Sequence, residues 1–186
     1  MIMVAALYVQ PSGTYYGLDG VEPWGLPDRD AREYTGPYPV VAHPPCARWG
    51  AYATGNPRWP GRYRVIEHPA YSKAWAHFGL FAPPAQGWVN ADLLGGWTCH
   101  VEQGHYGHLA RKATWLYVFG VATLPDLTWG PAQGKIRIDA GCRSTEEYRR
   151  RRRTGVVQLL SHRARAATPE PFRDLLLDIA RSVRLP

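Results

Sequence analysis

The sequence predicts one α/β domain with a small, mostly parallel sheet, and three observations support this. The chain has 186 residues, of which 45% are hydrophobic, so it can bury one core but is too short for two comfortable domains. Several short apolar runs are typical of strands buried on both faces, as in parallel sheets. Near the C-terminal end, apolar residues recur with the period of an amphipathic helix. We therefore expect residues 1–186 to form a single compact domain.

Four apolar runs are the expected strands, and segments rich in Gly and Pro separate them. The runs cover residues 4–9, 39–43, 62–68 and 115–121, of which 62–68 has the weakest pattern. Gly and Pro interrupt regular elements, so we expect loops at 10–38, 47–61 and 82–96.

Two segments are expected to be helical. Residues 144–153 begin with a Ser or Thr cap and acidic side chains and end in arginines, which complements a helix dipole. This segment lies in an otherwise irregular basic insertion, 125–155. The clearer helix covers 168–183, where Thr168 is the expected cap and prolines occupy the first turn. One face of it carries Phe172, Leu175, Leu176, Ile179 and Val183.

Charge and composition favour a nucleic-acid partner and a cytoplasmic location. The formal charge is +7 and the pI about 9.5, a balance that favours polyanions. Eight Trp and eleven Tyr suit base stacking, although most aromatic rings of a globular protein belong to its core. Three cysteines do not make a disulfide framework. The longest apolar run is too short to span a bilayer, and the N-terminal residues lack the basic start of a signal peptide.

Cys46 is the first candidate for chemistry. The segment "VVAHPPCARWG" (40–50) runs from an expected strand into two prolines, which end any regular element, and then into this cysteine. Such a rigid loop suits a nucleophile, and it also suits an inert thiol. Glu67 lies near the end of the next expected strand. Because doubly wound sheets place their chemistry beyond the carboxyl ends of their strands, the two side chains are expected to share one edge.

The order of these pieces resembles the cytosine-C5 DNA methyltransferases. Pro44, Pro45 and Cys46 match the Pro-Cys loop that carries the nucleophile of that family, and Glu67 in "VIEHP" stands in the place of its catalytic glutamate. The segment "YGHLARKATWLYV" (106–118) is similar to the basic motif that runs into a strand. The resemblance implies a reduced Rossmann-like methyltransferase fold and a pyrimidine base flipped out of DNA. The chain is also similar to small proteins encoded by tailed phages.

The resemblance also implies roles for individual residues. Cys46 would attack C6 of the pyrimidine as a thiolate, and Glu67 would be the acid that supports negative charge building on the ring. Other side chains would bind phosphate or base, or line the same cleft: Arg48, His105, His108, Arg111 and Lys112. The run "YRRRRR" adds Arg149, Arg150 and Arg151 as candidates for phosphate contacts, while its alternative is a solvated helix end.

S-adenosylmethionine is the cofactor that the resemblance implies. The segment "LYVQPSGTYYGL" has the length of the family's cofactor loop, with Gly13 as a cofactor-binding candidate and Glu22 as the candidate ribose-binding acid. Gln10 and Ser12 stand where two glycines are expected, so the backbone cannot approach a ligand as closely there. We therefore expect the cofactor to bind weakly, or not in the usual manner.

A second cluster of metal-ligand residue types lies in "WTCHVEQGHYGH". Cys99, His100, His105 and His108 fall within ten residues, but their spacing is not that of a zinc finger. If this stretch is extended, the adjacent Cys99 and His100 face opposite ways. We expect no metal site here.

Two alternatives to a base-modifying enzyme remain open. The first is a non-catalytic module that binds nucleic acid on the same scaffold, which would lose little when Cys46 is replaced by Ala. The second is a DNA glycosylase-like enzyme, because "IEHPAYS" (66–72) weakly resembles the His-Pro-Ser segment of uracil-DNA glycosylases.

Overall fold

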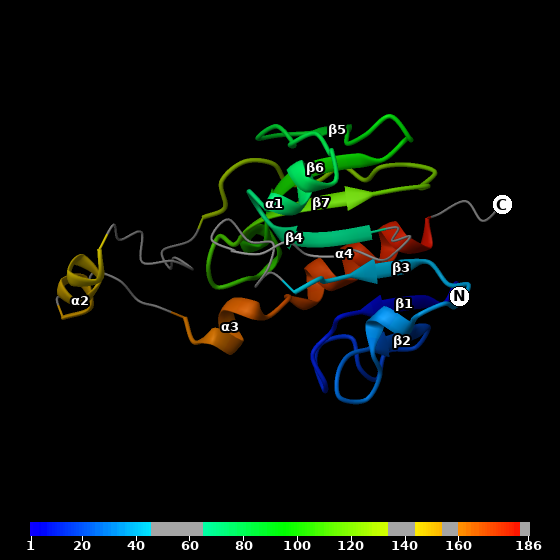
Figure 1. Ribbon diagram of the computed structural model, residues 1–186, viewed down its shortest axis with the longest axis horizontal. Coiled ribbons are helices and arrows are strands. Elements are labelled where there is room, and N and C mark those ends of the chain that lie inside the picture. The colour runs from blue at the N-terminus through cyan, green and yellow to red at the C-terminus, as the bar shows by residue number, and fades with distance from the viewer. Residues whose placement is uncertain (46–64, 134–143, 154–159, 183–186) are drawn as a thin grey trace.

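The computed structural model describes residues 1–45, 65–133, 144–153 and 160–182. Within these residues the chain forms one seven-stranded sheet with the order β2-β1-β3-β4-β7-β6-β5, flanked by a few helices (Figure 1). The α/β class is therefore confirmed. The strands are β1 (Val4–Leu7), β2 (Val21–Trp24), β3 (Val40–Ala42), β4 (Val65–Pro69), β5 (Trp88–Asn90), β6 (Trp97–Glu102) and β7 (Ala113–Val118).

The expectation of a mostly parallel sheet is wrong. Strands β2, β1, β3 and β4 pair in parallel, through ladders of four, three and two residue pairs. Strands β7, β6 and β5 continue the sheet as an antiparallel meander. The β6–β7 ladder has six residue pairs, the β5–β6 ladder has three, and the antiparallel β4–β7 ladder has five. Parallel neighbours need a crossover of a dozen or more residues, usually a helix. The short connections 91–96 and 103–112 are typical of antiparallel pairing instead.

Each expected strand has an observed counterpart, and three strands lie outside the expected ones. The counterparts are β1, β3, β4 and β7, with bounds shifted by a few residues. The three further strands are β2, β5 and β6, of which β2 and β5 lie inside segments expected to be loops. Pro23 concealed β2, since proline is unusual in strands, but β2 is the edge strand of the sheet, where proline is tolerated.

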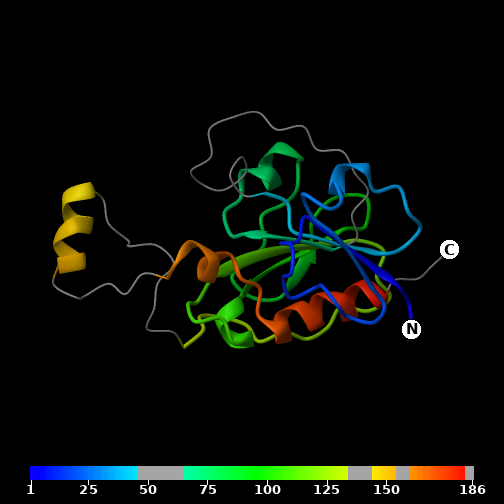
Figure 2. The same ribbon diagram turned by 90° about the horizontal axis from the view of Figure 1, so that it is seen from below.

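Helices lie on both faces of the sheet (Figure 2). α4 (Glu170–Arg181) packs against β1, β3 and β4, and it buries Phe172, Leu176 and Ile179 in the main core. On the opposite face lies the short α1 (Lys73–His77). The expected cap Thr168 is corrected to Pro169, and Leu177 and Ala180 add to the buried face. Leu175 is only partly buried, and Val183 lies outside the described residues.

The expected helix at 144–153 is α2 (Thr145–Arg153), so part of the basic insertion 125–155 is regular structure. The side-chain oxygen of Ser144 accepts a hydrogen bond from the Glu147 N–H at 3.1 Å, as a capping serine does. α3 (His162–Ala166) follows it in the chain and is capped in the same way by Ser161. None of the helices described is long and apolar enough to cross a membrane.

Candidate functional site

The described candidate site lies at the edge of the sheet where β1, β3 and β4 have their carboxyl ends. The chain leaves β1 toward β2 on one side, and β3 lies on the other side, so the strand order reverses between β1 and β3. Ligands of open α/β sheets bind at such switch points. Strand β6 runs in the same direction as β4, and β7 begins at this edge, so the antiparallel half contributes residues as well.

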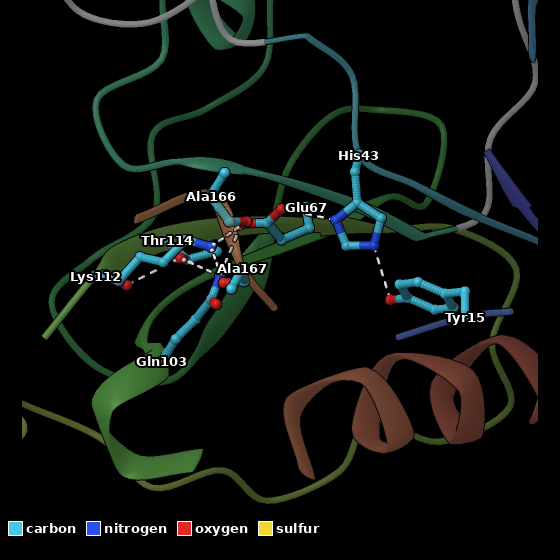
Figure 3. A network of polar contacts seen from close by, with 8 residues as sticks. All are labelled: Tyr15, His43, Glu67, Gln103, Lys112, Thr114, Ala166 and Ala167. Carbon is cyan, nitrogen blue, oxygen red and sulfur yellow. Dashed lines mark hydrogen bonds and ion pairs between the residues drawn. The ribbon is translucent and has the colours of Figure 1, made fainter. Parts of the chain in front are cut away.

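A buried hydrogen bond joins the end of β3 to β4 at this edge (Figure 3). His43 directly follows β3, and its Nδ1 lies 2.8 Å from Oε2 of Glu67 in β4. Side chains alternate along a strand, so Glu67 is on the same face as Val65, which belongs to the core beneath α4. Glu67 is only 7% exposed. The pair is therefore largely removed from water, on the α4 side of the sheet.

Gln103 holds the other carboxylate oxygen. Its Nε2 donates to Oε1 of Glu67 at 2.9 Å and to Oγ1 of Thr114 at 3.0 Å. The Thr114 hydroxyl donates in turn to the carbonyl oxygen of Lys112 at 3.0 Å. Gln103 is fully buried, and its Oε1 has no hydrogen-bond partner among the described groups. Both oxygens of Glu67 are thus fixed by the residues that directly follow β3 and β6, His43 and Gln103, which are far apart in the sequence.

Glu67 is ionised at neutral pH despite its burial. Burial alone raises the pKa of a carboxyl group, but the hydrogen bond from His43 and the positive charges of Lys112 and His43 outweigh it and lower the pKa of Glu67 to about 2. An ionised carboxylate only accepts hydrogen bonds, so Nδ1 of His43 must carry the proton that they share. Glu67 thereby fixes the orientation of the imidazole ring.

Tyr15 completes the chain of contacts on the other side of His43. Its hydroxyl lies 2.7 Å from Nε2 of His43, and the two rings are 5.2 Å apart. Burial raises the pKa of Tyr15 well above its usual value, so the phenol keeps its proton. With a neutral imidazole, the Tyr15 O–H donates to Nε2, and protonation of Nε2 reverses the direction of that bond. The Tyr15 hydroxyl can therefore act as donor or as acceptor toward Nε2.

Lys112 links this network to the segment after α3. Its Nζ donates to the carbonyl oxygens of Ala166 at 3.3 Å and Ala167 at 2.8 Å, at the end of α3. The backbone of Lys112 has φ 42°, in the left-handed region that few residues other than glycine adopt. This conformation and the two carbonyl contacts are specific features of the loop between η3 (Gln103–Tyr106) and β7.

Three residues that the sequence predicts to contact nucleic acid have hydrogen-bond partners within the protein: His105, His108 and Arg111. Nε2 of His105 lies 3.0 Å from the Gly130 carbonyl oxygen. Nδ1 of His108 accepts from the Ala110 N–H at 3.0 Å, and burial lowers the pKa of His108, which disfavours a charge for phosphate binding. The guanidinium of Arg111 donates twice to Glu102, at 2.8 and 2.9 Å.

The remaining predicted residues divide into two groups. Arg149, Arg150 and Arg151 lie in α2, where Arg149 and Arg150 are exposed. Cys46 and Arg48 lie outside the described residues, so their roles stay predictions. Glu67 is the predicted catalytic residue that the structure places at the carboxyl edge.

The residues expected to hold S-adenosylmethionine do not fit it in the usual manner. The N–H of Gly13 donates to the carbonyl oxygen of Gln10 in a tight turn, where a Cβ at Gly13 would lie 2.7 Å from that oxygen. Ser12 has φ 55° in the same turn. Glu22 lies inside β2 and accepts a hydrogen bond from Arg29, whose guanidinium lies over the Trp24 ring. These groups already have partners within the protein.

The described residues contain no cluster of three or more His, Cys, Asp or Glu side chains that could hold a metal ion. Cys99 and His100 are successive residues of β6, and Cys99 belongs to the core on the α4 side. Comparisons of the chain with family models, with curated proteins and with solved structures find no match.

Sequence reasoning missed most of this network. Tyr15, His43, Gln103 and Thr114 contribute to it and were not predicted as site residues. His43 could have been found, because it lies two positions after the buried Val41 on the same strand face and three before Cys46. For Tyr15 and Gln103 the sequence offers no comparable signal, since their partners come from distant segments.

Proposed function

We propose that this chain is an enzyme that modifies a pyrimidine base of a nucleic acid, expected to be DNA, on a reduced Rossmann-like methyltransferase scaffold. Cys46 is the nucleophile and Glu67 is the group that binds and polarises the base. The observation that carries the proposal is the buried, ionised Glu67 at the carboxyl edge of the sheet, held by His43 and Gln103. Perturbed, well-held carboxylates at such edges are typical of functional sites.

The proposed chemistry begins with the thiolate of Cys46. Its sulfur forms a bond to C6 of the pyrimidine, and the electron pair of the C5–C6 double bond moves toward C5 and into the ring. Covalent geometry alone keeps the Cα atoms of Cys46 and His43 within about 11 Å of each other, because only three peptide units separate them. In the sequence, Cys46 is thus only three positions from a residue of the described network.

Glu67 and His43 divide the proton chemistry in this proposal. The ionised carboxylate of Glu67 accepts a hydrogen bond from the exocyclic amino group of cytosine. In the imidazolium form of His43, the Nδ1 proton moves along the hydrogen bond to Glu67 and from that carboxyl group to N3 of the attacked ring. This leaves a neutral imidazole whose Nε2–H donates to the Tyr15 oxygen. Glu67 therefore acts as an acceptor in the free protein rather than as the acid that the resemblance implies.

The two alternatives predict different behaviour. A non-catalytic binding module would use the same surface without any covalent step. A base-excising enzyme would need His68 at the base, but this residue is 1% exposed and points to the face opposite Glu67. Burial lowers the pKa of His68 to about 4, so it is a neutral interior side chain. The described residues therefore favour the base-modifying proposal over excision.

The test is covalent capture on DNA that contains 5-fluorocytosine. Once an electrophile has added to C5, fluorine cannot leave as a cation, so the bond between Cys46 and C6 persists through denaturation. We expect an adduct in cell extract, none with Cys46→Ala, and much less with Glu67→Gln. Cys99→Ala is the matched control, because Cys99 is fully buried and pairs within the sheet. It should keep the adduct.

A consistent failure of capture would contradict the proposal. If neither pure protein nor extract gives an adduct, and Cys46 is alkylated no faster than a free thiol, the cysteine is not a nucleophile. Persisting affinity for nucleic acid in the same preparations would then favour the binding module.

A further inference from the structure

Tyr71 is an exposed aromatic residue at the same edge of the sheet. It follows the end of β4 by two residues and Glu67 by four, and it is 67% exposed. Its backbone has φ 63°, in the left-handed region. A bulky residue rarely adopts this conformation, and it persists where the surrounding structure fixes it, commonly at functional sites.

The neighbours of Tyr71 hold it in place on both sides. The Ala70 N–H donates to the carbonyl oxygen of Ala113 at 3.0 Å, which ties the preceding residue to the start of β7. The next residue, Ser72, caps α1 by accepting a hydrogen bond from the Ala74 N–H at 3.1 Å. The left-handed residue is therefore flanked by a strand end on one side and a helix cap on the other.

The ring of Tyr71 rests on other aromatic rings. It contacts Trp115 at a centroid distance of 5.5 Å and lies edge-on to His100 at 6.1 Å. Trp115 contacts Trp75 at 5.4 Å, and Trp75 is anchored by a hydrogen bond from its Nε1 to Thr98. Trp75 is 3% exposed and Trp115 is 7% exposed, so the exposed ring of Tyr71 has a rigid base.

One donor in this cluster has no partner. The Nε1–H of Trp115 is buried and makes no hydrogen bond among the described residues. Buried polar groups are rarely left unpaired, and such exceptions call for an explanation, among them a bound water or ligand. Because this N–H is closed to solvent, it shows how deeply the Trp115 ring beneath Tyr71 is buried and is not itself a contact for a ligand.

We propose that Tyr71, supported by Trp115 and His100, is a stacking platform for an unpaired base of a single-stranded nucleic acid. The net charge of +7 favours a polyanionic occupant over a neutral one. Every base has a flat π-face, so stacking of this kind tolerates any sequence. The platform is a binding site that needs no covalent step, and it shares only its class of partner with the function proposed above.

The experiment compares two fluorescein-labelled strands by anisotropy. One is a ten-nucleotide oligothymidine, and the other has the same phosphates with abasic sites in place of bases. We expect Tyr71→Ala to weaken binding of oligothymidine about five- to hundredfold, the effect of losing one stacked base. Binding of the abasic strand should stay within about twofold, because only the charges act there. Tyr71→Phe should bind both strands like the unmodified chain.

Two further variants separate stacking from misfolding. Tyr38→Ala removes another exposed tyrosine, just before β3 at the opposite edge of the sheet, and it should leave both affinities unchanged. Tyr71→Gly should melt at a higher temperature than Tyr71→Ala, because glycine relieves the left-handed backbone. It should bind oligothymidine as weakly as Tyr71→Ala.

Two results would overturn the platform. Either Tyr71→Ala binds oligothymidine as tightly as the unmodified chain, or both strands lose affinity equally. Because the assay involves no bond formation, its outcome does not depend on whether Cys46 forms an adduct.

Discussion

Glu67 shows how single residues set the electrostatics of this edge. Its carboxylate is buried, yet each oxygen accepts a hydrogen bond, from His43 and from Gln103. Hydrogen bonding to the charged form outweighs desolvation when it is this complete. The folded state therefore holds Glu67 charged where an unfolded chain would protonate it, and the stability of the protein must depend on pH.

Glu67→Gln should flatten that dependence in acid. The pKa of Glu67 falls from an ordinary value of 4.5 to about 2 on folding. The carboxylate therefore stabilises the fold above about pH 4.5, and this contribution is lost as pH falls through 4.5 toward 2. A shift of this size corresponds to a loss on the order of 3 kcal/mol. Urea unfolding at a series of pH values between 6 and 2 measures it.

The variant has no carboxyl group at position 67 and should lose less stability over the same range. Gln103→Leu provides a second comparison, since it removes one donor to Glu67 and should raise the pKa of that carboxyl group. Identical pH profiles for the unmodified chain and Glu67→Gln would show that Glu67 is not held ionised by the fold.

At the scale of elements, one hydroxyl attaches α1 to the antiparallel half of the sheet. Thr98 of β6 is fully buried, and its Oγ1 donates to the Leu116 carbonyl oxygen of β7 at 2.7 Å. The same atom accepts from Nε1 of Trp75 in α1 at 3.0 Å. A helix of only five residues has little stability of its own, so this contact and the packing of Trp75 keep α1 in place.

Thr98→Val should therefore destabilise the protein by about 1–3 kcal/mol. Valine has nearly the same shape, but it leaves the buried N–H of Trp75 without an acceptor. Faster hydrogen exchange in Ala74–His77 would show that the loss is local to α1. Thr98→Ser, which keeps the hydroxyl, should retain most of the stability. Equal stability of the Val and Ser variants would mean that packing alone holds α1.

At the scale of the whole molecule, the positively charged side chains near the candidate site and those in α2 have different surroundings. Around the candidate site, Arg111 and Lys112 make contacts within the protein, and α2 carries a run of consecutive arginines in which Arg149 and Arg153 are exposed. Binding to nucleic acid is governed by the counterions that such charges release. The run in α2 is therefore the described segment best suited to general phosphate contacts.

Replacing Arg149 to Arg153 with Gln should flatten the salt dependence of duplex DNA binding. Glutamine keeps the helix propensity of arginine and removes the charge. The slope of log Kobs against log salt concentration should fall by about 0.9 for each arginine that contacts a phosphate. Titrations between 50 and 200 mM salt measure it. An unchanged slope would assign the run to a solvated helix face.

Local pattern was enough to predict part of this architecture. Buried apolar runs predict β1, β3, β4 and β7, because a strand covered on both faces needs apolar residues at every position. The helical period predicts α4, and the charge order predicts α2. The carboxyl-edge position of Glu67 also follows from local sequence, since it needs only a strand and its direction.

Tertiary contacts alone decided the rest. Sheet order and the antiparallel half depend on which strands meet, and Pro23 hides β2 from any local rule. The candidate network joins residues 24, 28 and 36 positions apart, so no window of sequence contains it. Residue type also did not reveal that His108, Arg111 and Lys112 have partners within the protein. A side chain's chemistry is local, but its partners are supplied by the fold.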